Sequence, residues 1–308
     1  QADTNNNTCF IESIGTGQIG GQVAKAVAVP IGWQNWAALA VNNNNIIDVP
    51  SSASVSGCDS TCFNIGILGN PNDMYIQKGT HSCLNLPNNL QGAYGNPPTF
   101  PIDKTDVTQL ITQFNSFFSL QNYIQNRAQA QGCYCPGDAT ASGSTITCKS
   151  SSTLMSSSYC YIGGELDIDS SYNPSIPQVI YADELEIDIT GNSTIGSQTA
   201  PVAFVANEAD IDMHGTGNSS SSSNSSTNNK IYGLFLINNL DDFSIGNSSI
   251  GGAMYVNSGN VSIGGNASIN FNYAVLQQIT STFSDLFKHP TCRPQNPQQY
   301  LFNAVTLY

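Results

Sequence analysis

The sequence predicts a mainly β protein built around a right-handed β-solenoid, with an α-helical, disulfide-rich N-terminal region and an extended C-terminal tail. The first observation is a repeated phrase, Gly-Asn flanked by isoleucines, which recurs at Ile189–Ile195, Ile245–Ile250 and Ile263–Ile269. The second is that a short apolar strand precedes the phrase each time. Self-similarity at roughly 20 residues is typical of coils that bury their apolar side only by stacking.

The composition is that of a folded protein with few charges, which is the third observation. Hydrophobic residues make up 40% of the 308 residues, but Asp, Glu, Lys and Arg make up only 9%, against about 25% in an ordinary soluble domain. The net charge is −13, from 21 acidic and 8 basic residues. Binding to a phosphate backbone or an anionic membrane requires clustered Lys and Arg, so neither partner is expected.

Residues 1–95 are predicted to form a cysteine-containing N-terminal region with one helix. Apolar residues recur at steps of three and four between Gly20 and Val41, which indicates a helix that Pro30 would kink. Its apolar face either packs in the core or docks onto a partner subunit.

Residues 96–160 are predicted to hold an amphipathic helix followed by a disulfide-rich insertion. The helix is expected from Asp103 to Ala130, with Thr105 as its N-cap. We expect it to pack across one end of the solenoid and cover an edge that would otherwise be open to strand pairing.

The nine cysteines predict several disulfides and an exported protein, because disulfides form in oxidising compartments. They are Cys9, Cys58, Cys62, Cys83, Cys133, Cys135, Cys148, Cys160 and Cys292. Cys133 and Cys135 are too close in sequence to bridge easily to each other, so each should reach a different partner. Zinc is disfavoured because no Cys-x-x-Cys pair is present. The odd count leaves one thiol available for an intermolecular disulfide.

Residues 161–275 are predicted to be the solenoid, and four turns can be aligned. They are Val179–Ile195, Val202–Met213, Leu234–Ile250 and Ala253–Ile269. Each continues with alternating apolar and polar residues, and Gly-Asn supplies the positive φ that a tight corner needs. The Ser- and Asn-rich segment 218–229 is expected to leave the body as a flexible loop.

Residues 276–308 are predicted to form a short helix and a strand-like tail, the helix beginning at Ala274 and ending at Lys288. The tail is apolar and rich in strand-forming residues, so we expect it to add as a strand to a neighbouring subunit. The assembly residues would be Tyr300, Leu301, Phe302, Val305, Leu307 and Tyr308.

The succession from Ile231 to Asn270, with Phe243-Ser244-Ile245-Gly246-Asn247 and Val261-Ser262-Ile263-Gly264-Gly265-Asn266 within it, resembles the C-terminal solenoid of PilX-like proteins associated with bacterial type IV pili. The resemblance covers residues 161–275. It implies a surface or appendage protein. In that family an apolar N-terminal helix anchors the protein in the membrane, and no such helix is expected within these 308 residues.

Ten of the acidic residues gather between Glu165 and Asp212. If the turns stack as aligned, Glu186 and Asp188 lie beside Asp210 and Asp212, about 4.8 Å apart between strands. Stacked like charges repel, so these carboxylates are either solvated or share a hard cation such as calcium. Such pairs could also serve as the acid and base of a glycosidase, but the face has no Lys or Arg beside them, and we expect no catalysis.

Asn-x-Ser/Thr sequons could carry glycans, at Asn6, Asn192, Asn218, Asn224, Asn247, Asn260 and Asn266. No stretch is apolar for 18 residues, so no membrane span is expected, and any secretory signal would already have been removed from this start. No cofactor is expected apart from the calcium alternative. The sequence thus favours a homopolymeric structural subunit of an extracellular filament on the cell surface. The alternatives are a monomeric adhesin that binds surface glycans and a secreted polysaccharide-active enzyme.

Overall fold

The computed structural model describes residues 2–3, 8–11, 27–29, 38–41, 46–49, 53–56, 65–67, 75–78, 100–101, 117–215 and 229–287. The chain divides into two compact units, Trp36–Pro290 and a second unit made of Gln1–Asn35 with Thr291–Tyr308. In the second unit, β1 (Ala2–Asp3), β2 (Thr8–Ile11) and β3 (Val27–Val29) form a small antiparallel sheet.

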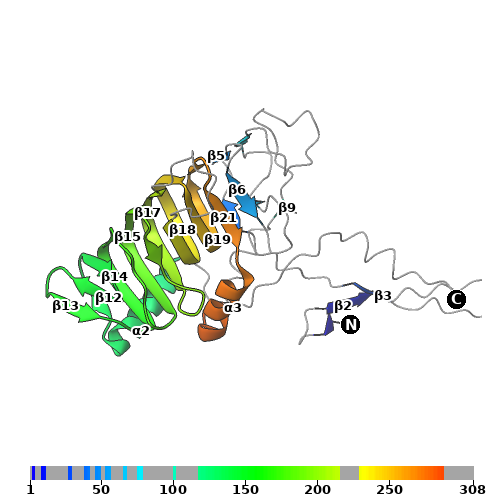
Figure 1. Ribbon diagram of the computed structural model, residues 1–308. Coiled ribbons are helices and arrows are strands. Elements are labelled where there is room, and N and C mark those ends of the chain that lie inside the picture. Colours follow the sequence, from blue (N-terminus) through cyan, green and yellow to red (C-terminus); the bar gives the residue numbers. More distant parts are fainter. Residues whose placement is uncertain are drawn as a thin grey trace, which may run out of the picture. The chain divides into compact units, whose positions relative to one another are not determined.

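The larger unit is mainly β and stacks successive windows of the chain in parallel (Figure 1). Its long strands are β14 (Tyr159–Ile168), β15 (Gln178–Gly191), β17 (Val202–Gly215), β18 (Asn229–Gly246) and β19 (Ser248–Gly259). The register aligns Val179 with Ala203, Ala203 with Leu234, and Leu234 with Ala253. The four predicted turns are therefore neighbours in the stack.

The coils pair along three faces of the stack. We name each face after the helices or the side chains on its outer side. The covered face consists of residues 159–162, 178–182, 202–206, 233–237 and 252–256. The acidic face consists of residues 165–168, 184–191, 208–214 and 239–246 with β20 (Val261–Ile263). The hydroxyl face runs through β16 (Thr194–Ile195), residues 230–231 and 249–252, and β21 (Ser268–Phe271).

The N-terminal segment continues this stack, which sequence analysis did not anticipate. Its strands are β4 (Leu39–Val41), β5 (Ile46–Val49), β6 (Ser54–Ser56), β7 (Ile65–Ile67), β8 (Tyr75–Lys78) and β9 (Phe100–Pro101). β4, β5 and β6 pair with β19, β20 and β21, and β7 and β8 pair with β4 and β5. The predicted helix from Gly20 to Val41 is wrong, because β3 and β4 lie within this range, one on each side of Pro30. Short apolar runs gain more from ladder pairing than from an isolated helix.

The other end of the stack is formed by the segment predicted to be a disulfide-rich insertion. β10 (Tyr134–Cys135) and β11 (Ala139–Ser142) pair with β14 in parallel, and Gly143 bridges to Tyr172. Residues 134–143 are thus a short terminal coil. The chain then reverses into β12 (Thr145–Cys148) and β13 (Thr153–Met155), which continue the sheet antiparallel.

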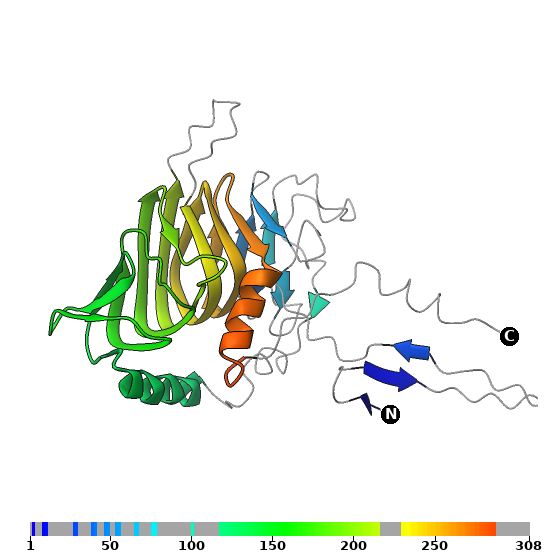
Figure 2. The same cartoon turned by 60° about the horizontal axis from the view of Figure 1, so that its bottom comes forward.

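Two helices lie on the covered face (Figure 2). α2 (Phe117–Gln131) buries Leu120, Ile124 and Ala128 and contacts β14 and β15, so it lies along the side of the stack and does not cross its end. The first half of the helix expected from Asp103 lies outside the described residues. α3 (Tyr273–Thr282), capped by Asn272, contacts β18 and β19. Among the described residues, no helix is both long and apolar enough to cross a membrane.

The position of α2 follows from the order of the coils. Residues 100–101 pair at one end of the stack and residues 134–135 at the other. The chain must therefore return along the body. A helix of 15 residues is about 22 Å long, which is the length of four to five strand spacings of about 4.8 Å.

The interior is a set of columns of like side chains. On the inner side of the hydroxyl face, Ile195, Ile231, Ile250 and Ile269 are in register and fully buried. On the inner side of the covered face, the rings of Phe204 and Phe235 stack at 5.2 Å between centroids. Gly191, Asn247 and Asn266 have φ values of 85°, 50° and 55°, which confirms the predicted role of Gly-Asn at the corners.

Candidate functional site: the acidic and hydroxyl faces

The acidic face arranges carboxylates in rows that run across the strands. One row is Glu165, Glu184 and Glu208, the next is Asp167, Glu186, Asp210 and Asp242, and the third is Asp188 and Asp212. Between them Leu185, Ile187 and Ile189 point inward and are buried. The predicted neighbours, Glu186 beside Asp210 and Asp188 beside Asp212, are confirmed by the register.

Crowding shifts the protonation of this face. The pKa of Glu186 is raised, first by burial and then by Glu165, Asp167 and Asp210 on the two neighbouring strands. The pKa of Asp210 is raised for the same reasons, with Asp242 and Asp212 as its main charged neighbours. The fold thus holds like charges side by side on neighbouring strands, and their repulsion destabilises the folded state.

One lysine relieves part of this repulsion, so the expectation that this face has no Lys or Arg is wrong. Lys149 Nζ lies 3.0 Å from Glu165 Oε1 and 3.9 Å from Asp167 Oδ2. His214 Nε2 lies 2.7 Å from Asp212 Oδ1, and both of these side chains are about half exposed. Both pairs lie on the outer surface, where water screens them.

The structure does not place the described acidic side chains around a calcium site. Glu186, Asp188, Asp210 and Asp212 share one face, as expected, but the part of the chain that the structure describes contains no group of three or more His, Cys, Asp or Glu placed to hold a metal ion. The rows point outward in parallel, whereas calcium takes six to eight oxygens that converge on it.

The hydroxyl face carries a different row on its outer side. Thr194, Lys230, Ser249 and Ser268 are in register, each preceding one of the buried isoleucines. This row was not predicted from the sequence. Its sequence pattern is a polar residue followed by isoleucine, which recurs once in each coil. Asn229 anchors it from within, since its Nδ2 donates to the Ile189 carbonyl at 2.9 Å and its Oδ1 accepts from the Ser193 amide at 2.9 Å.

Asparagine ladders follow the corners of the coils. Asn257 donates to Asn238 at 3.2 Å, and Asn238 donates to Asn207 at 3.1 Å. At another corner Asn266 donates to Asn247 at 3.3 Å. Of the sequon residues, Asn192, Asn260 and Asn266 are exposed and Asn247 is half-buried, whereas Asn6, Asn218 and Asn224 lie outside the described residues.

The two helices meet the covered face in a polar junction that the sequence did not indicate. The carboxylate of Asp285 accepts hydrogen bonds from Tyr123 and from Tyr159, the latter at 3.0 Å, and lies 3.5 Å from Arg127. Burial, followed by the Asp285 charge, raises the pKa of the Tyr159 hydroxyl. The ring of Tyr159 also packs edge-on against Phe283.

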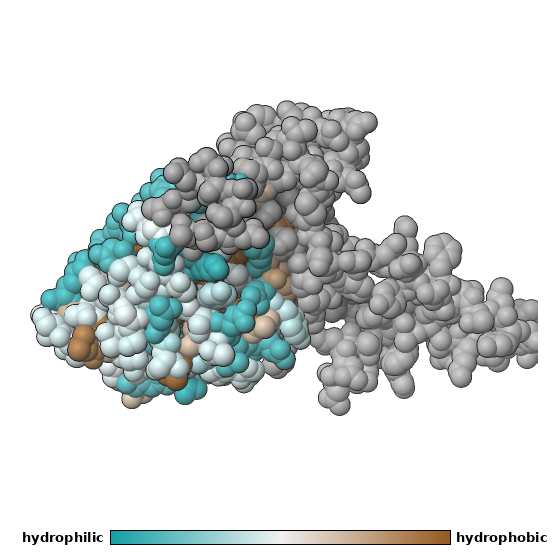
Figure 3. Space-filling view, in the orientation of Figure 1, coloured by the Kyte–Doolittle hydropathy of each residue, from teal (hydrophilic) through white to brown (hydrophobic). Residues whose placement is uncertain are grey.

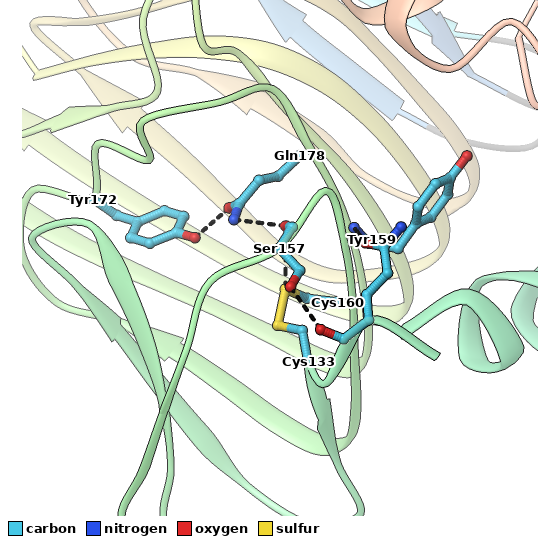
Figure 4. The surroundings of a disulfide bond; sticks show 7 residues. Cys133, Ser157, Tyr159, Cys160, Tyr172 and Gln178 are labelled. Carbon is cyan, nitrogen blue, oxygen red and sulfur yellow. Dashed lines mark hydrogen bonds between the residues drawn. A yellow bond between two sulfur atoms is a disulfide. The ribbon is translucent and has the colours of Figure 1, made fainter. Parts of the chain in front are cut away.

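The terminal coil is fixed by two disulfides. One is Cys133–Cys160 (Figure 4), and the other is Cys135–Cys148. The prediction that Cys133 and Cys135 reach different partners is confirmed. Gln178, which is fully buried, accepts a hydrogen bond from Tyr172 and donates to the Ser157 carbonyl at 2.9 Å. Cys9 lies in β2. The remaining cysteines, Cys58, Cys62, Cys83 and Cys292, lie outside the described residues, as do the predicted assembly residues Tyr300–Tyr308 and residues 218–228 of the predicted loop. The last residue of that predicted loop, Asn229, is instead buried in β18.

The face of the described residues that Figure 3 shows is mostly hydrophilic, with a few small hydrophobic patches. Its exposed large hydrophobic side chains are Phe118, Leu154, Ile176 and Tyr273, of which Phe118 and Leu154 are each 69% exposed. Leu154 lies on β13, which pairs with β12 at the end of the sheet that holds the two disulfides.

No family model matches the chain, and no curated protein matches it either. Among solved structures, it is similar to an ice-binding protein (LeIBP) from an Arctic yeast, whose description names antifreeze activity. The identity is 10%, the match covers 77% of this chain and 90% of the other, and the TM-score is 0.35.

Proposed function

We propose that this chain is an exported structural subunit of an extracellular filament or pilus-like surface appendage, and that copies assemble by strand addition. The observation that carries the proposal is the open sheet, whose pairings lead from the hairpin β12–β13 at one end to β8 and β9 at the other. An open edge can be continued by a strand from another copy. The PilX-like resemblance of residues 161–275 supports the same role.

Export is supported by the two disulfides of the terminal coil, because such bonds persist in oxidising compartments. We take the coils to be right-handed, the hand that parallel crossover connections prefer. Two disulfides use four of the nine cysteines and leave five, an odd number. One of those five is thus available for a bond between copies.

A monomeric glycan-binding adhesin is the second candidate, and the hydroxyl face favours it. Its outer row holds the hydroxyls of Thr194, Ser249 and Ser268 and is interrupted by Lys230. Half-buried Tyr232 and Asn270 lie beside it. Hydroxyl and amide groups in a regular row suit a repeating polar ligand such as a polysaccharide. A catalytic role would instead require product release that disappears in Glu186→Gln or Asp210→Asn.

Electron microscopy and size-exclusion chromatography of the purified full chain test the proposal. We expect polymers that shorten or disappear when residues 297–308 are deleted. Monomers over the whole accessible concentration range, with or without sugar binding, would contradict the filament role. Normal polymers from the deleted chain would contradict assembly through the tail.

A further inference from the structure

β13 is the outermost strand at the disulfide-fixed end of the sheet. In the part of the chain that the structure describes, its residues are in register with β12 alone, and this antiparallel register pairs Thr147 with Leu154. Figure 1 shows β13 outside β12 at this end of the sheet. One side of its backbone therefore presents N–H and C=O groups to another strand. Such an edge is a template for pairing with a second chain.

The β13 edge is short, at three residues, but its side chains offer no protection against pairing. Natural edges carry lysine, proline or a bulge, whereas β13 reads Thr-Leu-Met and exposes 69% of Leu154. The neighbouring β12 is held to β10 by the Cys135–Cys148 disulfide. The edge is thus preformed, so a strand that adds to it need not order it first.

Charge makes the broad faces less suitable for contact between copies. Residues 117–215 and 229–287 contain 14 Asp and Glu, against Arg127, Lys149 and Lys230 as their Lys and Arg. Two acidic faces would repel each other, and α2 and α3 already lie on the covered face. The strands β12 and β13 contain no charged residue.

We propose that β13 receives the segment Tyr300–Tyr308 of a second copy of this chain as a further strand. The inference rests on the proposed function and names the surface through which it would work. From Pro294 to Tyr308 no residue carries a charged side chain, so pairing desolvates none. The segment is rich in Tyr, Phe, Leu, Val and Thr, which favour strands, and in its own chain it belongs to the compact unit that does not contain β13.

The test uses the full chain and a fluorescent peptide of residues 297–308, with binding followed by anisotropy. Leu154→Lys places a charge on the edge at an exposed position, so folding should be unaffected while binding weakens roughly tenfold or more. Phe118→Lys is the matched control, because Phe118 is equally exposed at 69% but lies on α2. A scrambled peptide of the same composition controls for adhesion of an apolar sequence.

Binding of the native peptide to the wild type and to Phe118→Lys, but not to Leu154→Lys, supports the inference. Hydrogen exchange should then show new protection at residues 153–155. No binding to the wild type up to roughly 1 mM peptide, or equal loss in both variants, would overturn it. If the chain binds the peptide specifically but never polymerises, the β13 site is supported and the filament role is contradicted. If Leu154→Lys still forms polymers, the filament role is supported and the β13 site is contradicted.

Discussion

The covered face and the acidic face are built from the same coils, yet their outer sides differ completely. Residues 178–182 are buried without interruption, whereas residues 184–189 alternate between outward acids and buried Leu185, Ile187 and Ile189. On the covered face Tyr159, Tyr161 and Tyr181 point outward and meet α2. A strand reads as a continuous apolar run where helices cover it, and as an alternating one where water does.

This comparison separates two kinds of stabilisation. The inner columns of both faces should contribute alike, since they share one interior. The outer sides should differ, because the covered face gains packing and hydrogen bonds while the acidic face bears repulsion. The predictions below test each part, beginning with the largest expected effect.

The inner columns carry the largest contribution. Phe235→Ala removes a ring that is fully buried and stacked on Phe204, and we expect the free energy of unfolding to fall by about 3–5 kcal/mol. Phe243→Ala, at a position 1% exposed on the inner side of the acidic face, should cost a similar amount. Urea unfolding followed by circular dichroism measures both. A cost below about 1 kcal/mol for Phe243 alone would show that the two faces do not share one interior.

The junction on the outer side of the covered face should come next. Asp285→Ala leaves the Tyr159 hydroxyl, in a side chain only 6% exposed, without its acceptor, and we expect a loss of about 1–3 kcal/mol. Tyr159→Phe removes the donor instead, so in the double variant the two losses should not add. Additive losses in chemical unfolding would contradict a direct role for this hydrogen bond.

Much of the repeat could be predicted from the sequence, and the order of the coils could not. The Gly-Asn phrases and apolar strands placed Glu186 beside Asp210, because the spacing of the phrases fixes the register. The coils at Leu39–Ser56 lack the phrase, and their position after β19 depends on long-range pairing that no local pattern reports. Likewise, the short strands of the terminal coil were hidden among Gly, Ser and Cys.

The functional surfaces divide in the same way. The acidic face could be predicted because acidic and apolar residues alternate along each of its strands, and this pattern is visible in the sequence of a single strand. The junction of Tyr123, Tyr159 and Asp285 joins residues up to 162 positions apart, so nothing in a local window indicates it. The edge at Leu154 was not predicted either. A strand is an edge only if no further strand pairs with it in the fold, and its own sequence does not reveal this.

On the outer side of the acidic face we expect stability to rise on mild acidification. The pKa values of Asp167, Glu184, Glu186 and Asp210 are raised above the ordinary 3.8 of Asp and 4.5 of Glu, so the folded chain binds these protons more tightly than the unfolded chain. The stabilisation is therefore absent at pH 7 and grows as the pH falls through the raised values toward 4.5. The melting temperature should be a few degrees higher at pH 5 than at pH 7.

A charge-removing variant makes this pH prediction specific. Glu186→Gln combined with Asp210→Asn removes one pair of neighbours in the middle row, and should stabilise the chain at pH 7 by up to about 1 kcal/mol. Its melting temperature should also depend less on pH between 7 and 5. If the wild type instead melts at a lower temperature at pH 5, a bound cation that protonation displaces becomes the better account of these rows.

The smallest effect should come from the base that relieves the acidic face. Lys149→Met removes the contacts with Glu165 and Asp167, and because these side chains are partly exposed we expect a loss below about 1 kcal/mol. The loss should vanish in 1 M salt, where the screening length is about 3 Å. Lys230→Met is the matched control, since this exposed lysine lies in the ladder of the hydroxyl face. If both variants lose the same stability at low salt, overall charge rather than the contact with Glu165 and Asp167 accounts for the effect, and the rows of the acidic face then behave as independent solvated groups.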